Sequence, residues 1–104
     1  MLKVTITYKD STTETMTLQR LASYKYEDDY LRFVNYYLRG TGSLYTFWSK
    51  LTGDKEVSSI VVDGNTGVVL NINNYLKADY TSVLNAETET AKEELIFTLV
   101  EKNV

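Results

Sequence analysis

Residues 2–18 read LKVTITYKDSTTETMTL, and they carry the clearest structural pattern in the chain. Apolar and polar side chains alternate over Leu2 to Lys9 and again over Thr13 to Leu18, and many of them are β-branched, as is typical of strands. The polar residues 10–12 between the two runs suit a turn. We therefore predict a β-hairpin in which the apolar side chains of both strands share one face, namely Leu2, Val4, Ile6, Tyr8, Met16 and Leu18.

Residues 20–38 fit two structures. A helix beginning in the acidic turn at residues 27–29 would bury one stripe of leucine and valine side chains and end before Gly40. Alternatively, Leu21 to Tyr26 and Tyr30 to Leu38 are two strands joined by that acidic turn. The segment is dense in aromatic side chains, which lose rotamer freedom in a helix and pack well across a sheet. We therefore predict two strands.

The middle of the chain contains a second hairpin. Residues 64–67, GNTG, offer glycines for a tight turn between the runs Val57 to Asp63 and Val68 to Ile72. These runs are apolar on both faces, which predicts a central pair of strands covered on each side. Before this hairpin, the aromatic segment Ser43 to Lys50 predicts a further strand.

The last third of the chain supplies the predicted helix. Over Asn74 to Asn85, four apolar residues follow helical spacing, so a short helix is expected to cover the sheet. Thr90 and Glu93 resemble a capping box that would open another helix, but the apolar run Leu95 to Val100 favours a strand, which we predict. The expected fold is α+β: an antiparallel β-meander sheet with one or two short helices packed on it, in a single domain over residues 1–104.

The composition excludes most familiar catalytic chemistry. The chain of 104 residues has neither cysteine nor histidine, so it lacks the groups for a disulfide, a Cys/His zinc site or a Ser-His-Asp triad. We expect no enzyme, no cofactor and no bound metal. A net charge of −3 and a pI near 4.9 disfavour direct nucleic-acid binding. Neither a signal peptide nor a membrane helix is indicated, so we expect a cytoplasmic protein without membrane contact.

Two glycine-containing segments have some features of ligand loops. Residues 63–67 do not continue into an EF-hand, and residues 39–43 lack the Lys-Ser/Thr of a phosphate loop, so both are interpreted as turns or caps. The tight acidic clusters are Glu27-Asp28-Asp29 and Glu93-Glu94. Paired carboxylates catalyse or hold metals in a cleft, for which so short a chain leaves little room. We interpret them as solvated segments, with surface recognition as the functional alternative.

Aromatic side chains gather in the middle of the chain. Six of the nine tyrosines, two of the three phenylalanines and the only tryptophan lie between Tyr24 and Trp48. Neighbours on a strand point to opposite faces, so some rings reach the surface unless a second layer covers them. They form either core and cross-strand pairs or an interface or stacking platform. The candidate binding residues are therefore Glu27, Asp28, Asp29, Tyr36, Tyr37, Trp48, Glu93 and Glu94.

Three segments carry a family resemblance: Tyr30-Leu31-Arg32-Phe33-Val34, Tyr45-Thr46-Phe47-Trp48 and Val57-Ser58-Ser59-Ile60-Val61-Val62-Asp63. With the absence of proline and the abundance of tyrosine, asparagine and threonine, this order resembles small β-rich accessory proteins of phages and mobile elements of Gram-positive bacteria. Such proteins are often non-enzymatic and bind a host or phage protein, as anti-CRISPR inhibitors do. The resemblance implies protein binding, and it carries over no functional residue because these families share no site motif.

The leading hypothesis is therefore a non-catalytic protein-binding module. Its expected partner is a bacterial nuclease or other nucleic-acid enzyme, inhibited in the anti-CRISPR manner by acidic side chains that occupy a groove meant for phosphate. One alternative is a structural phage protein or homo-oligomer that uses the aromatic residues as a self-complementary interface. The other is single-stranded nucleic-acid binding through stacking on tyrosine and tryptophan.

Overall fold

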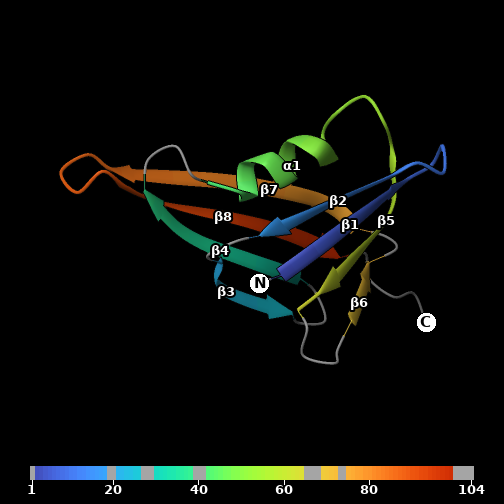
Figure 1. Ribbon diagram of the computed structural model, residues 1–104, viewed down its shortest axis with the longest axis horizontal. Coiled ribbons are helices and arrows are strands. Elements are labelled where there is room, and N and C mark those ends of the chain that lie inside the picture. Colours follow the sequence, from blue (N-terminus) through green and yellow to red (C-terminus); the bar gives the residue numbers. More distant parts are fainter. Residues whose placement is uncertain are drawn as a thin grey trace.

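The computed structural model describes residues 2–18, 21–26, 30–38, 42–64, 69–72 and 75–99. Its strands form two four-stranded antiparallel sheets, sheet A in the order β2-β1-β5-β6 and sheet B in the order β3-β4-β8-β7 (Figure 1). The predicted α+β class with antiparallel pairing and a short helix is confirmed, with the strands divided between two sheets. The elements in chain order are β1 (Leu2–Tyr8), β2 (Thr13–Leu18), β3 (Leu21–Tyr26), β4 (Tyr30–Leu38), α1 (Leu44–Leu51), β5 (Val57–Asp63), β6 (Val69–Ile72), β7 (Tyr75–Asn85) and β8 (Thr90–Leu99).

Both predicted hairpins are present in sheet A. β1 pairs with β2 from Leu2 opposite Leu18 to Thr7 opposite Thr13, and the apolar side chains of β1 are buried as expected. β5 pairs with β6, and its turn residues 65–68 lie outside the described part of the chain. The prediction that this pair is covered on both faces is wrong. β6 lies at the sheet edge, where Val69 is 48% exposed, and β5 buries only alternate residues.

Sheet B contains the segments that the sequence left ambiguous. Residues 21–26 and 30–38 are strands, paired from Leu21 opposite Asn35 to Tyr26 opposite Leu31. The apolar run at residues 95–99 lies in a strand, as predicted, but strand β8 begins at Thr90, so the polar residues before the run, expected to form a turn, belong to the strand as well. β8 lies between β4 and β7, and pairing on both sides extends it. The acidic turn at residues 27–29, which was expected to join the first two strands, lies outside the described residues.

The predicted strand at residues 43–50 is wrong, because the segment forms helix α1. Leu44, Phe47 and Leu51 recur at helical spacing and are all buried, so one face of the helix enters the core. Aromatic content had suggested a strand, but burial of this one stripe stabilises a helix. Within the described residues, no helix is long and apolar enough to cross a membrane.

The predicted helix at residues 74–85 is also wrong, because Tyr75–Asn85 forms strand β7. The strand pairs with β8 from Tyr75 opposite Leu99 to Asn85 opposite Thr90. This long ladder satisfies the backbone of the segment through the next strand along the chain, a partner that lies outside the segment whose spacing predicted a helix. Asn74, expected to cap the helix, lies outside the described residues.

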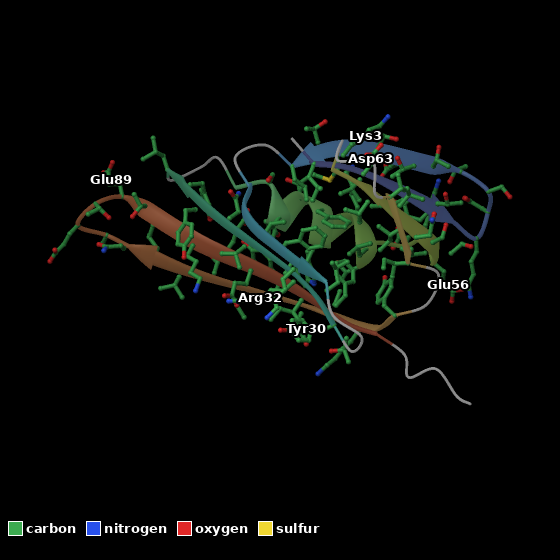
Figure 2. The ribbon with its side chains drawn as sticks, turned by 90° about the horizontal axis from the view of Figure 1, so that it is seen from below. Lys3, Tyr30, Arg32, Glu56, Asp63 and Glu89 are labelled. Atoms are coloured by element: carbon green, nitrogen blue, oxygen red, sulfur yellow. The ribbon has the colours of Figure 1, made fainter. Side chains whose placement is uncertain are left out.

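One hydrophobic core joins the two sheets and the helix. Ile6 and Ile60 of sheet A belong to the same buried cluster as Phe33 and Phe97 of sheet B and Phe47 of α1. The three phenylalanine rings contact one another, with centroids 5.7 to 6.0 Å apart. Figure 2 shows sheet A above and sheet B below, with α1 between them. The molecule is elongated, 48 × 28 × 26 Å, and the β7–β8 hairpin forms one end of it (Figure 1).

Candidate functional site

The carboxylate of Glu93 lies at the centre of sheet B and is fully buried. Its Oε1 accepts hydrogen bonds from Asn35 Nδ2 at 3.0 Å and from the backbone N–H of Leu44 at 2.7 Å. Its Oε2 accepts from the Tyr80 hydroxyl at 2.8 Å and from the backbone N–H of Tyr45 at 3.3 Å. A buried carboxylate is tolerated only with such partners, so Glu93 joins β4, β7 and α1 at a single point.

Glu93 also serves as the cap of helix α1. The first backbone N–H groups of a helix have no partner within the helix, and they carry partial positive charge. Ser43 occupies the N-cap position but makes no capping hydrogen bond through its side chain. The carboxylate of Glu93 satisfies the N–H groups of Leu44 and Tyr45 instead. Glu93 was expected from the sequence to be a binding residue at the surface, but it is buried and positions the helix.

Two neighbours fit closely around this carboxylate. Burial, the hydrogen bond to Glu93 and the negative charge of Glu93 all raise the pKa of the Tyr80 hydroxyl, so Tyr80 remains a donor. Gly42 also lies close to the carboxylate of Glu93. A Cβ at position 42 would lie 2.9 Å from Glu93 Oε2 and 2.9 Å from Cζ of Tyr37. A side chain at position 42 would have to displace Glu93 or Tyr37, so this close approach favours glycine.

The opposite face of sheet B, which we call the outer face, carries exposed apolar side chains. Opposing residues in a sheet share a face, and Lys92 lies opposite both Tyr36 of β4 and Val83 of β7. Tyr36 is 58% exposed and Val83 is 68% exposed. Leu38, two residues beyond Tyr36 on the same face, is also 58% exposed. We call Tyr36, Leu38, Val83 and Lys92 the outer patch.

An ion-pair network borders the outer patch. Glu94 accepts from the Arg32 guanidinium and lies 3.2 Å from Lys92 Nζ. The hydrogen bond from Arg32, followed by the one from Lys92, lowers the pKa of the Glu94 carboxyl. Figure 2 shows Arg32 and Tyr30 on the side of sheet B that faces away from sheet A. The border is therefore charged, with one carboxylate between two cations, as at the polar rim of an interface.

A second group of rings lies on the inner face, over α1 and β7. The Trp48 ring stacks on Tyr80 with centroids 5.5 Å apart, and its N–H donates to the Ala78 carbonyl at 3.3 Å. Tyr45, which is 55% exposed, contacts both rings. Trp48 is thus occupied in holding the helix against β7, whereas Tyr45 remains at the surface.

The structure divides the candidate residues among different places. Tyr36 belongs to the outer patch, and Tyr37 points to the opposite face, as strand geometry requires. Glu94 borders the patch, Trp48 packs on Tyr80 and Glu93 is internal. The acidic residues 27–29 lie outside the described part of the chain. Sequence reasoning missed Leu38 and Lys92 altogether and assigned Val83 to the buried side of a helix.

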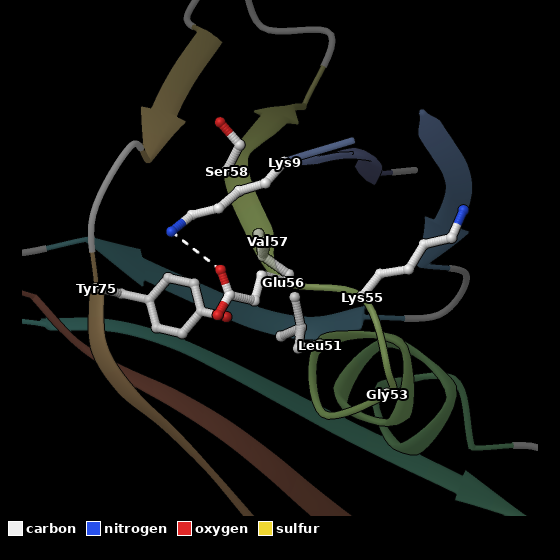
Figure 3. A pocket seen from close by; sticks show the side chains of 8 residues that line it. All are labelled: Lys9, Leu51, Gly53, Lys55, Glu56, Val57, Ser58 and Tyr75. Atoms are coloured by element: carbon white, nitrogen blue, oxygen red, sulfur yellow. Dashed lines mark ion pairs between the residues drawn. The ribbon is translucent and has the colours of Figure 1, made fainter. Parts of the chain in front are cut away.

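A shallow groove of about 530 Å³ lies beside the C-terminus of α1, toward the end of the molecule opposite the β7–β8 hairpin (Figure 3). Its charged side chains already have partners: Lys9 lies 3.1 Å from Glu56, and Lys55 contacts Asp10 at 3.4 Å and Thr12 at 2.9 Å. Among the residues that the structure describes, no group of three acidic side chains could hold a metal ion. The groove is lined by Lys9, Leu51, Gly53, Lys55, Glu56, Val57, Ser58 and Tyr75.

Comparison with known proteins adds no assignment. No protein-family model matches the chain, and searches of curated proteins and of solved structures found no match. Any functional conclusion therefore rests on the residues of this chain.

Proposed function

We propose that this chain is a non-catalytic protein-binding module that contacts its partner through the outer patch of sheet B. The single observation that carries the proposal is the exposure of Tyr36, Leu38 and Val83 on one face, around Lys92. Neighbouring exposed apolar side chains within a charged border are typical of protein interfaces, and tyrosine is enriched among the residues that contribute most to binding.

The class of partner in this proposal is the one that the sequence resemblance implies, a bacterial nuclease or another nucleic-acid enzyme. The manner of contact differs from the one expected from sequence. Glu93 is internal and Glu94 is compensated by Arg32 and Lys92, so neither supports mimicry of phosphate. Contact through rings and aliphatic groups is better supported, and binding of this kind weakens little as salt concentration rises.

Two tyrosines of similar exposure provide the test. Tyr36 in the outer patch is 58% exposed and Tyr45 on α1 is 55% exposed, so Tyr36→Ala and Tyr45→Ala remove similar surface rings at different places. The tagged protein is used to retain partners from a lysate of a Gram-positive bacterium, and the affinity for the retained protein is then measured. Loss of a central interface ring costs about 2 kcal/mol, so we expect Tyr36→Ala to weaken binding about 30-fold and Tyr45→Ala to change it little.

The proposal fails if Tyr36→Ala binds the retained protein as tightly as the unchanged chain does. It also fails if Tyr45→Ala produces the larger loss, because the contact would then lie over α1. Circular dichroism of both variants verifies that neither substitution has unfolded the sheet.

A further inference from the structure

The four edge strands of the two sheets are not equally protected against pairing with another chain. An edge strand presents unpaired backbone groups, and short length or charged side chains discourage further pairing. β6 has only four residues. β2 carries Glu14, whose carboxylate lies 3.2 Å from Lys50 Nζ, and β3 carries the exposed Lys25. Three of the four edges thus have one of these protections.

β7 is the least protected of the four. It has 11 residues, and its charged side chains, Lys77 and Asp79, lie in its inner half, 3.4 Å from each other. Its outer half, Thr81 to Asn85, is uncharged and exposed on both faces. Val83 is 68% exposed and Leu84 is 47% exposed. The irregularity in its pairing with β8 lies at the other end, between Tyr75 and Lys77, so the outer half is a regular strand. Such an edge favours the addition of another strand.

We propose that β7 pairs antiparallel with β7 of a second copy of this chain, around a two-fold axis at Ser82. The two copies of sheet B then form one continuous sheet with their outer faces on the same side. This pairing goes beyond the proposed function, because it uses the edge of sheet B rather than its outer patch. Identical strands related by a two-fold axis form a closed interface, which ends at two chains.

The side chains of β7 are complementary in this register. Thr81 lies opposite Val83 of the second copy, and Tyr80 lies opposite Leu84, so each exposed apolar residue gains a cross-strand partner. Lys77, which lies 3.4 Å from Asp79 of its own chain, also lies opposite Glu87 of the second copy, just beyond the strand end. The two-fold axis repeats this contact between opposite charges.

Neighbouring registers are less favourable. An axis at Thr81 places the charged Asp79 opposite the apolar Val83. An axis at Val83 places Asp79 opposite Glu87, and like charges in this position are destabilising. The axis at Ser82 avoids both contacts, which is why the inference names a second copy and this register.

A single introduced thiol tests the register directly, because the chain contains no cysteine. Ser82→Cys would place two thiols opposite each other across the axis, where Cα atoms of paired strands lie about 4.5 to 5.5 Å apart, within the range for a disulfide. Thr15→Cys is the matched control, because Thr15 is an exposed hydroxyl residue on the edge strand β2. On mild oxidation we expect Ser82→Cys to form a covalent dimer and Thr15→Cys to remain monomeric.

Sedimentation equilibrium of the unchanged chain provides a second measurement. We expect the mass to rise to twice 11.9 kDa as concentration increases. Ser82→Lys, which places two lysines opposite each other, should weaken this association about tenfold or more. The inference is overturned if the unchanged chain remains monomeric at high concentration, or if Ser82→Cys cross-links no faster than Thr15→Cys. Dimerisation that Ser82→Lys leaves unaffected would also overturn it, because the interface would lie elsewhere.

Discussion

Glu93 on β8 accepts a 2.7 Å hydrogen bond from the backbone N–H of Leu44. A carboxylate of sheet B therefore caps a helix that begins 49 residues earlier in the chain. The same carboxylate also accepts hydrogen bonds from the Asn35 side-chain amide, the Tyr45 backbone N–H and the Tyr80 hydroxyl. The geometry of the inner face therefore depends on one buried acidic residue. Helix α1 in turn covers part of sheet B and contributes Phe47 to the core.

We predict that Glu93→Ala destabilises the fold strongly. The substitution leaves several buried donors without an acceptor, each of which costs about 1 to 3 kcal/mol. Allowing for partial relaxation, urea denaturation should show a loss of about 3 kcal/mol in the free energy of unfolding. Asp54→Ala, in the exposed segment after α1, is the control and should change stability by less than about 0.5 kcal/mol. A loss below about 1 kcal/mol for Glu93→Ala would contradict the capping role.

Gly42→Ala tests the close approach of the loop to the same carboxylate. The added methyl group would lie 2.9 Å from both Glu93 Oε2 and the Tyr37 ring, so one of them must move. We expect a loss of about 1 to 3 kcal/mol in the free energy of unfolding, as for other overpacked sites. Gly53→Ala is the matched control, because its nearest atoms are at 3.7 and 3.9 Å and a methyl group fits without displacement. Equal stability of the two variants would show that the contact around Gly42 is not tight.

Stability should fall at alkaline pH partly because of Tyr8. Burial, followed by the hydrogen bond to Glu14, raises the pKa of Tyr8 from 10.0 to about 12. Because the pKa is higher in the folded state, the unfolded chain loses this proton first as pH rises. The stabilisation is therefore complete below about pH 10 and is lost between about pH 10 and pH 12. Tyr8→Phe should reduce the slope of unfolding free energy against pH in that range, and an unchanged slope would refute the assignment.

The fold class could be predicted from local sequence patterns because most of the strands have a clear strand pattern in their sequence. Apolar and polar residues alternate clearly in β1 and β2, which predicted these strands correctly. At residues 30–38 the density of aromatic residues favoured a strand over a helix with one apolar stripe, and the segment is a strand. The two errors, at residues 44–51 and 75–85, share a cause. Each segment has mixed spacing, and its conformation depends on a partner outside the segment: Glu93, 49 residues after Leu44, for α1 and the following strand β8 for β7. The spacing within each segment does not contain those partners.

The candidate site was predictable only in part, for the same reason. Alternation predicted that Tyr36 and Tyr37 face opposite sides, and Tyr36 is exposed. The sequence could not show that Val83 would lie on the same face as Tyr36, because that placement follows from the register of both strands with Lys92. Nor could it show that Glu93, adjacent to the partly exposed Glu94, would be internal. Assignment of residues 90–99 to a strand does place the two carboxylates on opposite faces, which was the one available signal.

The most direct measurement for the central proposal is photo-cross-linking from one position in the outer patch. A photoreactive phenylalanine derivative replaces Tyr36 in one variant and the similarly exposed Tyr45 in another, and both are irradiated in cells of a Gram-positive bacterium. We expect a discrete covalent adduct with one bacterial protein from position 36 and none from position 45. An adduct from position 45 alone, or no protein adduct from either position, would contradict it.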